Sequence, residues 1–92
     1  MISIVAKFTV NAGEENNFLK LVNDLGIASR AEEGCVEYVL HKDVQKPLTY
    51  CILEKWKDQA AIDSHNSSVH FTSTVPKIVA IAKAEIDVYR LI

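Results

Sequence analysis

Two histidines, His65 and His70, lie on either side of the polar tripeptide Asn66-Ser67-Ser68. A neutral imidazole can accept a proton from a substrate or donate a hydrogen bond to a developing oxyanion, because its unperturbed pKa lies near physiological pH. The structural alternative is a histidine that caps a helix or makes a hydrogen bond in the core. We predict that His65 and His70 are the catalytic residues.

A carboxylate and an indole lie close to these histidines in the sequence. Strand alternation over residues 50–56 places Tyr50, Ile52, Glu54 and Trp56 on one face, and a glutamate between two apolar neighbours needs polar partners if it is buried. If that face looks toward the helices, it lines the gap in which a small domain can hold a ligand. An ion-paired Glu54 and a core Trp56 are the structural alternatives. We predict that Tyr50, Glu54, Trp56 and the following Phe71 bind substrate.

His41 is a further substrate-binding candidate, although strand alternation alone does not decide which face of its strand it occupies. A metal site made of His41, His65 and His70 lacks a known ligand spacing and has no carboxylate beside it in the sequence. We therefore predict no metal site. No glycine-rich phosphate loop, dinucleotide fingerprint or GxSxG motif is present, so we expect no cofactor and no acyl-transfer hydrolysis.

Composition and charge exclude several classes of protein. The 92 residues carry a net charge of −2 without any run of lysine or arginine, which gives no indication of nucleic acid or an anionic membrane as a partner. No apolar run approaches the ~18 residues that a membrane span requires, and the first residues do not resemble a signal peptide. We expect a cytoplasmic protein whose two cysteines, Cys35 and Cys51, are reduced and mostly buried.

Hydrophobic periodicity predicts four strands, one long helix and a broken second helix in a single domain, residues 1–92. The predicted strands cover residues 2–10, 35–43, 48–57 and 83–92, and the helices cover 13–32, 58–65 and 69–82. The order β-α-β-β-α-β is that of the ferredoxin-like α+β fold, with helices on one face of an antiparallel sheet.

Three local signals set the predicted helix boundaries. Asn11 and Glu14 resemble a capping arrangement at the start of the first helix, and Gly34 stands where a left-handed residue ends it. Pro76 is expected to bend the last helix or to mark its true start, because a proline inside a helix removes one hydrogen bond.

Every predicted strand is apolar on both faces, whereas helices can cover only one face of the sheet. The second strand offers Val36, Tyr38 and Leu40 on one side and Cys35 and Val39 on the other. Since the domain uses the whole chain, we expect a second copy to cover the open face, forming a homodimer with its sheets face to face.

Several segments together resemble the antibiotic biosynthesis monooxygenase (ABM) domain family, and the likeness runs nearly end to end. They are residues 33–38 (EGCVEY), 41–43 (HKD), 53–58 (LEKWKD), 60–65 (AAIDSH) and 69–71 (VHF). The resemblance implies a dimeric α/β barrel with a pocket between sheet and helices in each chain. Members carry out different reactions, so the fold does not select one.

Three functions are candidates, and the resemblance implies the first two. The first is cofactor-independent oxygenation of a small phenolic or quinol-type substrate, with a histidine as proton acceptor. The second is isomerisation of a small phosphorylated carbonyl compound, as in autoinducer-2 processing, and the third is a non-catalytic small-ligand-binding dimer. Haem degradation is not expected, because the first strand lacks the asparagine of that branch and His65 stands where it has tryptophan.

Overall fold

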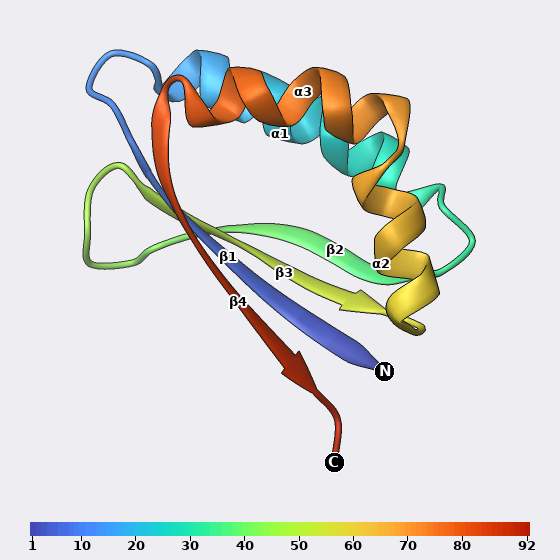
Figure 1. The fold of residues 1–92 in the computed structure, drawn as a ribbon. Coiled ribbons are helices and arrows are strands. Elements are labelled where there is room, and N and C mark those ends of the chain that lie inside the picture. Colours follow the sequence, from blue (N-terminus) through green and yellow to red (C-terminus); the bar gives the residue numbers. More distant parts are fainter.

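Four antiparallel strands form a sheet, and three helices cover one of its faces (Figure 1). The computed structural model describes all residues, 1–92. The elements are β1 (Ile2–Val10), α1 (Glu15–Arg30), β2 (Cys35–Lys42), β3 (Thr49–Trp56), α2 (Gln59–Asn66), α3 (Val69–Val79) and β4 (Ala82–Arg90). The strand order β2-β3-β1-β4 confirms the predicted ferredoxin-like α+β fold. The sheet of one chain is open, so a single chain does not close a barrel.

The core lies between the helices and alternate residues of the two central strands. On β3 the predicted row is confirmed, because Tyr50, Ile52, Glu54 and Trp56 are all buried while Leu53 and Lys55 between them are exposed. These four residues lie opposite helix-facing residues of β1, in the order Phe8, Ala6, Ile4 and Ile2. Figure 1 shows α1 and α3 side by side above the sheet, with α2 over one end.

The predicted faces of β2 were wrong at its beginning. A bulge between Cys35 and Glu37 shifts the register, so that Cys35 pairs with Trp56 and packs against the core. Val36 is the extra residue and is 55% exposed, although alternation had placed it with the buried Tyr38. A bulge inserts one residue into one strand only, and period-two counting from the sequence cannot detect it.

Both predicted boundary signals of α1 were also wrong. Glu14 occupies the N-cap position without a side-chain cap, and Asn11 contributes only its backbone carbonyl, which accepts from the Glu14 N–H at 3.0 Å. Gly34 does not have a positive φ. Its small size is needed for another reason, since a Cβ there would lie 2.3 Å from the Cβ of Ala61 in α2. The loop before β2 can therefore approach α2 closely.

The break between α2 and α3 is held by two caps. The Asp58 side chain accepts from the Ala61 N–H at 2.9 Å and starts α2. Ser68 starts α3 by accepting from the Phe71 N–H, and its hydroxyl also donates to the His65 carbonyl at 2.6 Å. This one serine joins the end of one helix to the start of the next. Pro76 does not mark the start of α3, which begins at Val69 and continues past it.

The face of the sheet away from the helices is partly apolar. Val5, Leu53 and Val39 lie opposite one another on β1, β3 and β2 and form a row across three strands. Val39 is 41% exposed and Leu53 is 38% exposed, so this row remains uncovered in one chain. No helix of the structure has the length and apolar character needed to cross a membrane.

Candidate functional site

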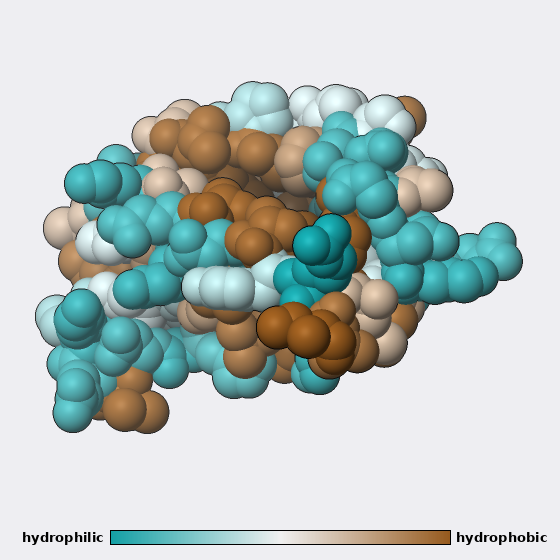
Figure 2. Space-filling model, turned by 60° about the horizontal axis from the view of Figure 1, so that its bottom comes forward, coloured by the Kyte–Doolittle hydropathy of each residue, from teal (hydrophilic) through white to brown (hydrophobic).

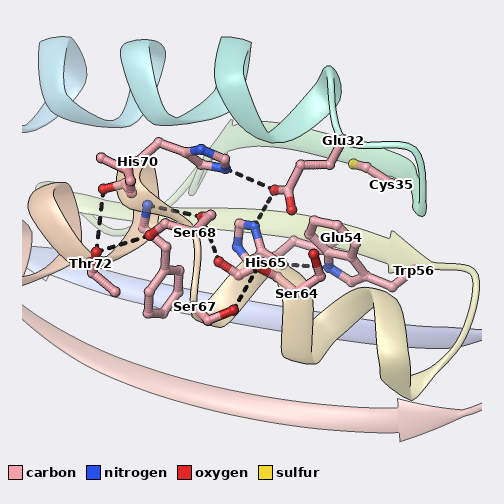
Figure 3. Close-up of polar contacts among 12 residues, drawn as sticks. Glu32, Cys35, Glu54, Trp56, Ser64, His65, Ser67, Ser68, His70 and Thr72 are labelled. Carbon is pink, nitrogen blue, oxygen red and sulfur yellow. Dashed lines mark hydrogen bonds and ion pairs between the residues drawn. The ribbon is translucent and has the colours of Figure 1, made fainter.

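Glu32 connects the two predicted catalytic histidines. Its Oε2 atom lies 2.6 Å from His65 Nδ1 and 2.9 Å from His70 Nε2, and Figure 3 shows the carboxylate between the two imidazoles. The carboxylate can only accept hydrogen bonds when it is ionised, so each histidine donates its N–H to it. The three side chains come from three segments: the loop after α1, the end of α2 and the first turn of α3.

Backbone hydrogen bonds fix the loop that carries Glu32. The Glu32 N–H donates to the Ser29 carbonyl at 3.1 Å, and the Glu32 carbonyl accepts from the Cys35 N–H at 3.1 Å. Sequence reasoning missed this residue, because it precedes His65 and His70 by 33 and 38 positions. A local signal did exist, since Glu32 stands immediately before the segment EGCVEY on which the family resemblance depends.

The second ring nitrogen of His65, Nε2, is available for a hydrogen bond to a ligand. Because Nδ1 donates to Glu32, the neutral ring carries no proton on Nε2, which is then an acceptor. Nε2 has no hydrogen-bond partner in the chain, and the only fully enclosed side-chain polar atom without a partner is Ser29 Oγ. The side chain of His65 is only 4% exposed, and the residue lines a cavity between the sheet and the helices.

Aromatic side chains surround the His65 imidazole. Its centroid lies 4.4 Å from the ring of Trp56 and 5.1 Å from that of Phe71, with Tyr38 at 5.9 Å. Burial is the main influence on its titration and lowers the pKa of His65, although the Glu32 carboxylate acts in the opposite direction. The imidazole is therefore neutral near pH 7 and able to accept a proton.

Glu54 is a second buried carboxyl group beside this cluster. It is 7% exposed, and its Oε1 accepts a hydrogen bond from Trp56 Nε1 at 2.9 Å. Burial raises the pKa of Glu54 to about 7, because the hydrogen bond from Trp56 only partly offsets desolvation and the Glu32 charge adds to it. A substantial fraction of Glu54 is therefore a neutral acid at physiological pH and can donate a hydrogen bond.

A cavity of about 470 Å³ lies between the sheet and the helices, and most of the residues that line it are hydrophobic. Its polar lining includes Glu54 and His65, and apolar walls come from all layers, among them Ile52, Val75, Ile78, Ile86 and Val88. Figure 2 shows a hollow bordered by hydrophobic surface. Ile86 and Val88 of β4 are more than half exposed, so the cavity opens along that edge strand. Its size and lining suit a small, largely apolar molecule.

The structure brings together only part of the predicted site. Glu54, His65 and Phe71 line the cavity, whereas Trp56 stacks on His65 without lining it and His70 contacts Glu32 outside it. Tyr38, which sequence reasoning did not select, is part of the lining.

Two predicted substrate-binding residues lie away from this cavity. His41 is exposed opposite Cys51 on the open face of the sheet, so it does not line this cavity. Tyr50 lies on the helix side of the sheet but does not line the cavity. Its hydroxyl donates a hydrogen bond to Glu15 and accepts one from Lys42. Alternate residues of a strand face opposite sides of the sheet. The bulge at Cys35 interrupts this alternation in β2, so the sequence alone does not show which side of the sheet His41 faces.

The sequence model of the antibiotic biosynthesis monooxygenase family matches residues 1–77. The chain belongs to the antibiotic biosynthesis monooxygenase family. It is 39% identical to YcnE of Bacillus subtilis over 90 residues, which cover 98% of this chain and 95% of YcnE.

Solved structures agree with this family assignment. A conserved protein from Methanosarcina mazei has a TM-score of 0.93 and 32% identity, covering 97% of this chain and 90% of its own. A structure described as antibiotic biosynthesis monooxygenase has a TM-score of 0.92 and 28% identity, covering 100% and 99% of the two chains. The predicted membership of the ABM family is thus confirmed over nearly the whole chain.

Proposed function

We propose that this ABM-family protein is a cofactor-independent monooxygenase of a small phenolic or quinol-type compound, with His65 as the proton acceptor. One observation carries the proposal: His65 lines an apolar cavity and its Nε2 has no hydrogen-bond partner in the chain, while its Nδ1 is held by Glu32 at 2.6 Å. A base that is oriented by a second group is the arrangement that general-base catalysis requires.

The reaction needs only the substrate, dioxygen and a base. His65 Nε2 takes the phenolic proton, and the phenolate passes one electron to dioxygen. The resulting radicals combine at a ring carbon that bears hydrogen, forming a C–O bond. The peroxide anion takes the proton back from His65 and becomes a hydroperoxide, which loses water as its O–O and C–H bonds break and leaves a quinone carbonyl. One oxygen atom enters the product and the other enters water, so no external reductant is consumed.

Glu54 and Glu32 have different roles in this scheme. The neutral form of Glu54 can donate a hydrogen bond to the oxyanion that forms in the cavity, where water is scarce and such a bond is strong. Glu32 fixes the tautomer of His65, and His70 donates to the same carboxylate oxygen. His70 is therefore a positioning residue in this proposal, because it does not line the cavity.

The lining of the cavity favours an uncharged aromatic over a phosphorylated substrate. An isomerase of a phosphorylated compound needs cations to hold the phosphate, and no lysine or arginine is among the residues that line the cavity. Lys42 and Lys55 lie outside the cavity and pair with Glu15 and Glu37, respectively. We therefore keep the oxygenase as the proposed function.

Oxygen uptake tests the proposal directly. Chelator-treated protein is offered a panel of small phenols and quinols in an oxygen electrode, and we expect one dioxygen consumed for each quinone formed. With labelled dioxygen, one labelled atom should appear in the product. Turnover that persists without oxygen would point instead to an isomerase. Saturable binding without oxygen uptake above the uncatalysed rate would favour the non-catalytic dimer.

We also propose that a second copy of the chain covers the open face of the sheet. The apolar row Val5–Leu53–Val39 is flanked by pairs of opposite charge, Glu37 with Lys55 and Lys7 with Glu85, and such a face can pair with itself about a twofold axis.

Changing Leu53 to Asp should therefore convert a dimer into a monomer, because it places a charge at the centre of the row. Light scattering at micromolar concentration measures the mass. Val44→Asp is the matched control, because Val44 is 98% exposed in a loop outside this face. A one-chain mass for the unchanged protein would refute the dimer.

A further inference from the structure

The cluster of Glu32, His65 and His70 has the donor atoms of a metal site. One atom from each residue, a carboxylate oxygen and two imidazole nitrogens, lies within 4.8 Å of the other two. Two histidines and one carboxylate form a common donor set for catalytic zinc and for other divalent transition metals. We propose that these three residues bind a divalent transition-metal ion of the zinc type.

Small movements bring these donors to coordination distance. Bonds of about 2.0–2.2 Å in a tetrahedral site place neighbouring ligand atoms roughly 3.3 Å apart. The two nitrogens now lie 2.6 and 2.9 Å from Glu32 Oε2, so each has to move away from that oxygen by less than 1 Å as the ion replaces the shared protons. The nitrogens themselves lie within 4.8 Å of each other and have to approach by at most about 1.5 Å. The link from Ser68 to the His65 carbonyl keeps the two histidines on neighbouring turns during this change.

Charge and access also favour a cation. Glu32 has no lysine or arginine within ion-pair distance. The only basic side chains that close to its carboxylate are His65 and His70. A poorly solvated carboxylate without a permanent countercharge is unfavourable, and a divalent ion supplies that charge. The side chains of Glu32 and His70 are 16% and 26% exposed, so an ion can enter from solvent and keep water as a remaining ligand.

Metal binding has a consequence for the base, and this consequence rests on the proposed function. When a metal occupies Nδ1, the neutral imidazole of His65 carries its proton on Nε2. Nε2 then donates a hydrogen bond into the cavity and can no longer accept the phenolic proton. The ion would therefore inhibit the oxygenase.

Zinc titration of the tag-free, chelator-treated protein tests the site without any activity measurement. Calorimetry should give one zinc ion per chain. Loss of an outer-shell partner alone typically weakens binding about 10- to 100-fold, so His70→Gln and Glu32→Gln should each weaken it at least tenfold. His41→Gln removes an exposed histidine on the other face and should leave the affinity unchanged.

Thermal unfolding provides a second readout, because a ligand that binds only the folded state raises Tm. At the same zinc concentration, Tm should rise in the unchanged protein and in His41→Gln, and should rise less in His70→Gln. Equal zinc affinity in the unchanged protein and His70→Gln, or no stoichiometric binding, would overturn the site. Binding with the expected variant pattern but without inhibition of oxygen uptake would support the site and count against His65 as the base.

Discussion

Replacing His65 with glutamine is expected to lower kcat for oxygenation about 100- to 10,000-fold, which is the usual contribution of a positioned general base. Glutamine can still donate a hydrogen bond to Glu32 in place of His65 Nδ1, but it cannot accept the phenolic proton. KM should change much less than kcat, because the substrate is bound by apolar walls of the cavity. Steady-state oxygen uptake over a range of substrate concentrations separates the two constants.

His41→Gln is the matched control for this experiment. It makes the same chemical change on the open face of the sheet, opposite Cys51 and outside the cavity. Provided that light scattering gives an unchanged mass, it should keep the kcat of the unchanged protein. Circular dichroism shows whether His65→Gln folds, since the residue is only 3% exposed. Glu32→Gln gives a second test, because it leaves His65 in place but removes the acceptor that fixes its tautomer. A folded His65→Gln protein with undiminished kcat would remove His65 from the mechanism.

The second large effect concerns stability and pH, and it depends on Glu54. Its pKa is raised from an ordinary value of 4.5 to about 7 in the folded protein. Between these two pH values the folded state binds a proton that the unfolded state has lost, so the free energy of unfolding decreases as pH rises through this window. A change of this size corresponds to about 3 kcal/mol, present below the window and lost above it.

Glu54→Gln should therefore gain stability relative to the unchanged protein as pH rises. Glutamine does not titrate, and its carbonyl can still accept the hydrogen bond from Trp56. We expect the difference in unfolding free energy between variant and unchanged protein to grow by about 3 kcal/mol from pH 4.5 to pH 8. Denaturant unfolding at one fixed protein concentration measures it, since the stability of the proposed dimer would depend on concentration.

Titratable groups that do not interact with Glu54 are common to both proteins, so their contributions cancel in this difference. Asp24→Asn makes a matched carboxylate-to-amide change at an exposed position of α1, away from the open face of the sheet, and is the control. A difference for Glu54→Gln that does not change between pH 4.5 and pH 8 would show that the folded protein does not raise the pKa of Glu54.

Local patterns in the sequence determined much of this fold. Alternation identified the buried row of β3, including Glu54 and Trp56, because side chains of a strand point to opposite faces in turn. The polar break before Val69 located the two helices that carry the histidines, since serine at that point caps a helix. These features depend on residues that are close together in the chain. The short motifs that resemble the antibiotic biosynthesis monooxygenase family are local in the same sense.

Tertiary structure alone decided which residues form the site. Glu32 meets His65 and His70 across 33 and 38 residues, because the close approach at Gly34 brings the loop after α1 against α2. The same packing leaves His41 on the other side of the sheet. Contacts between distant segments depend on the strand register, on a bulge and on the space that one small residue leaves. None of these three features produces a periodic pattern from which the sequence could predict it. The sequence therefore determined the two histidines as candidates, and only the packed chain supplied the carboxylate that joins them.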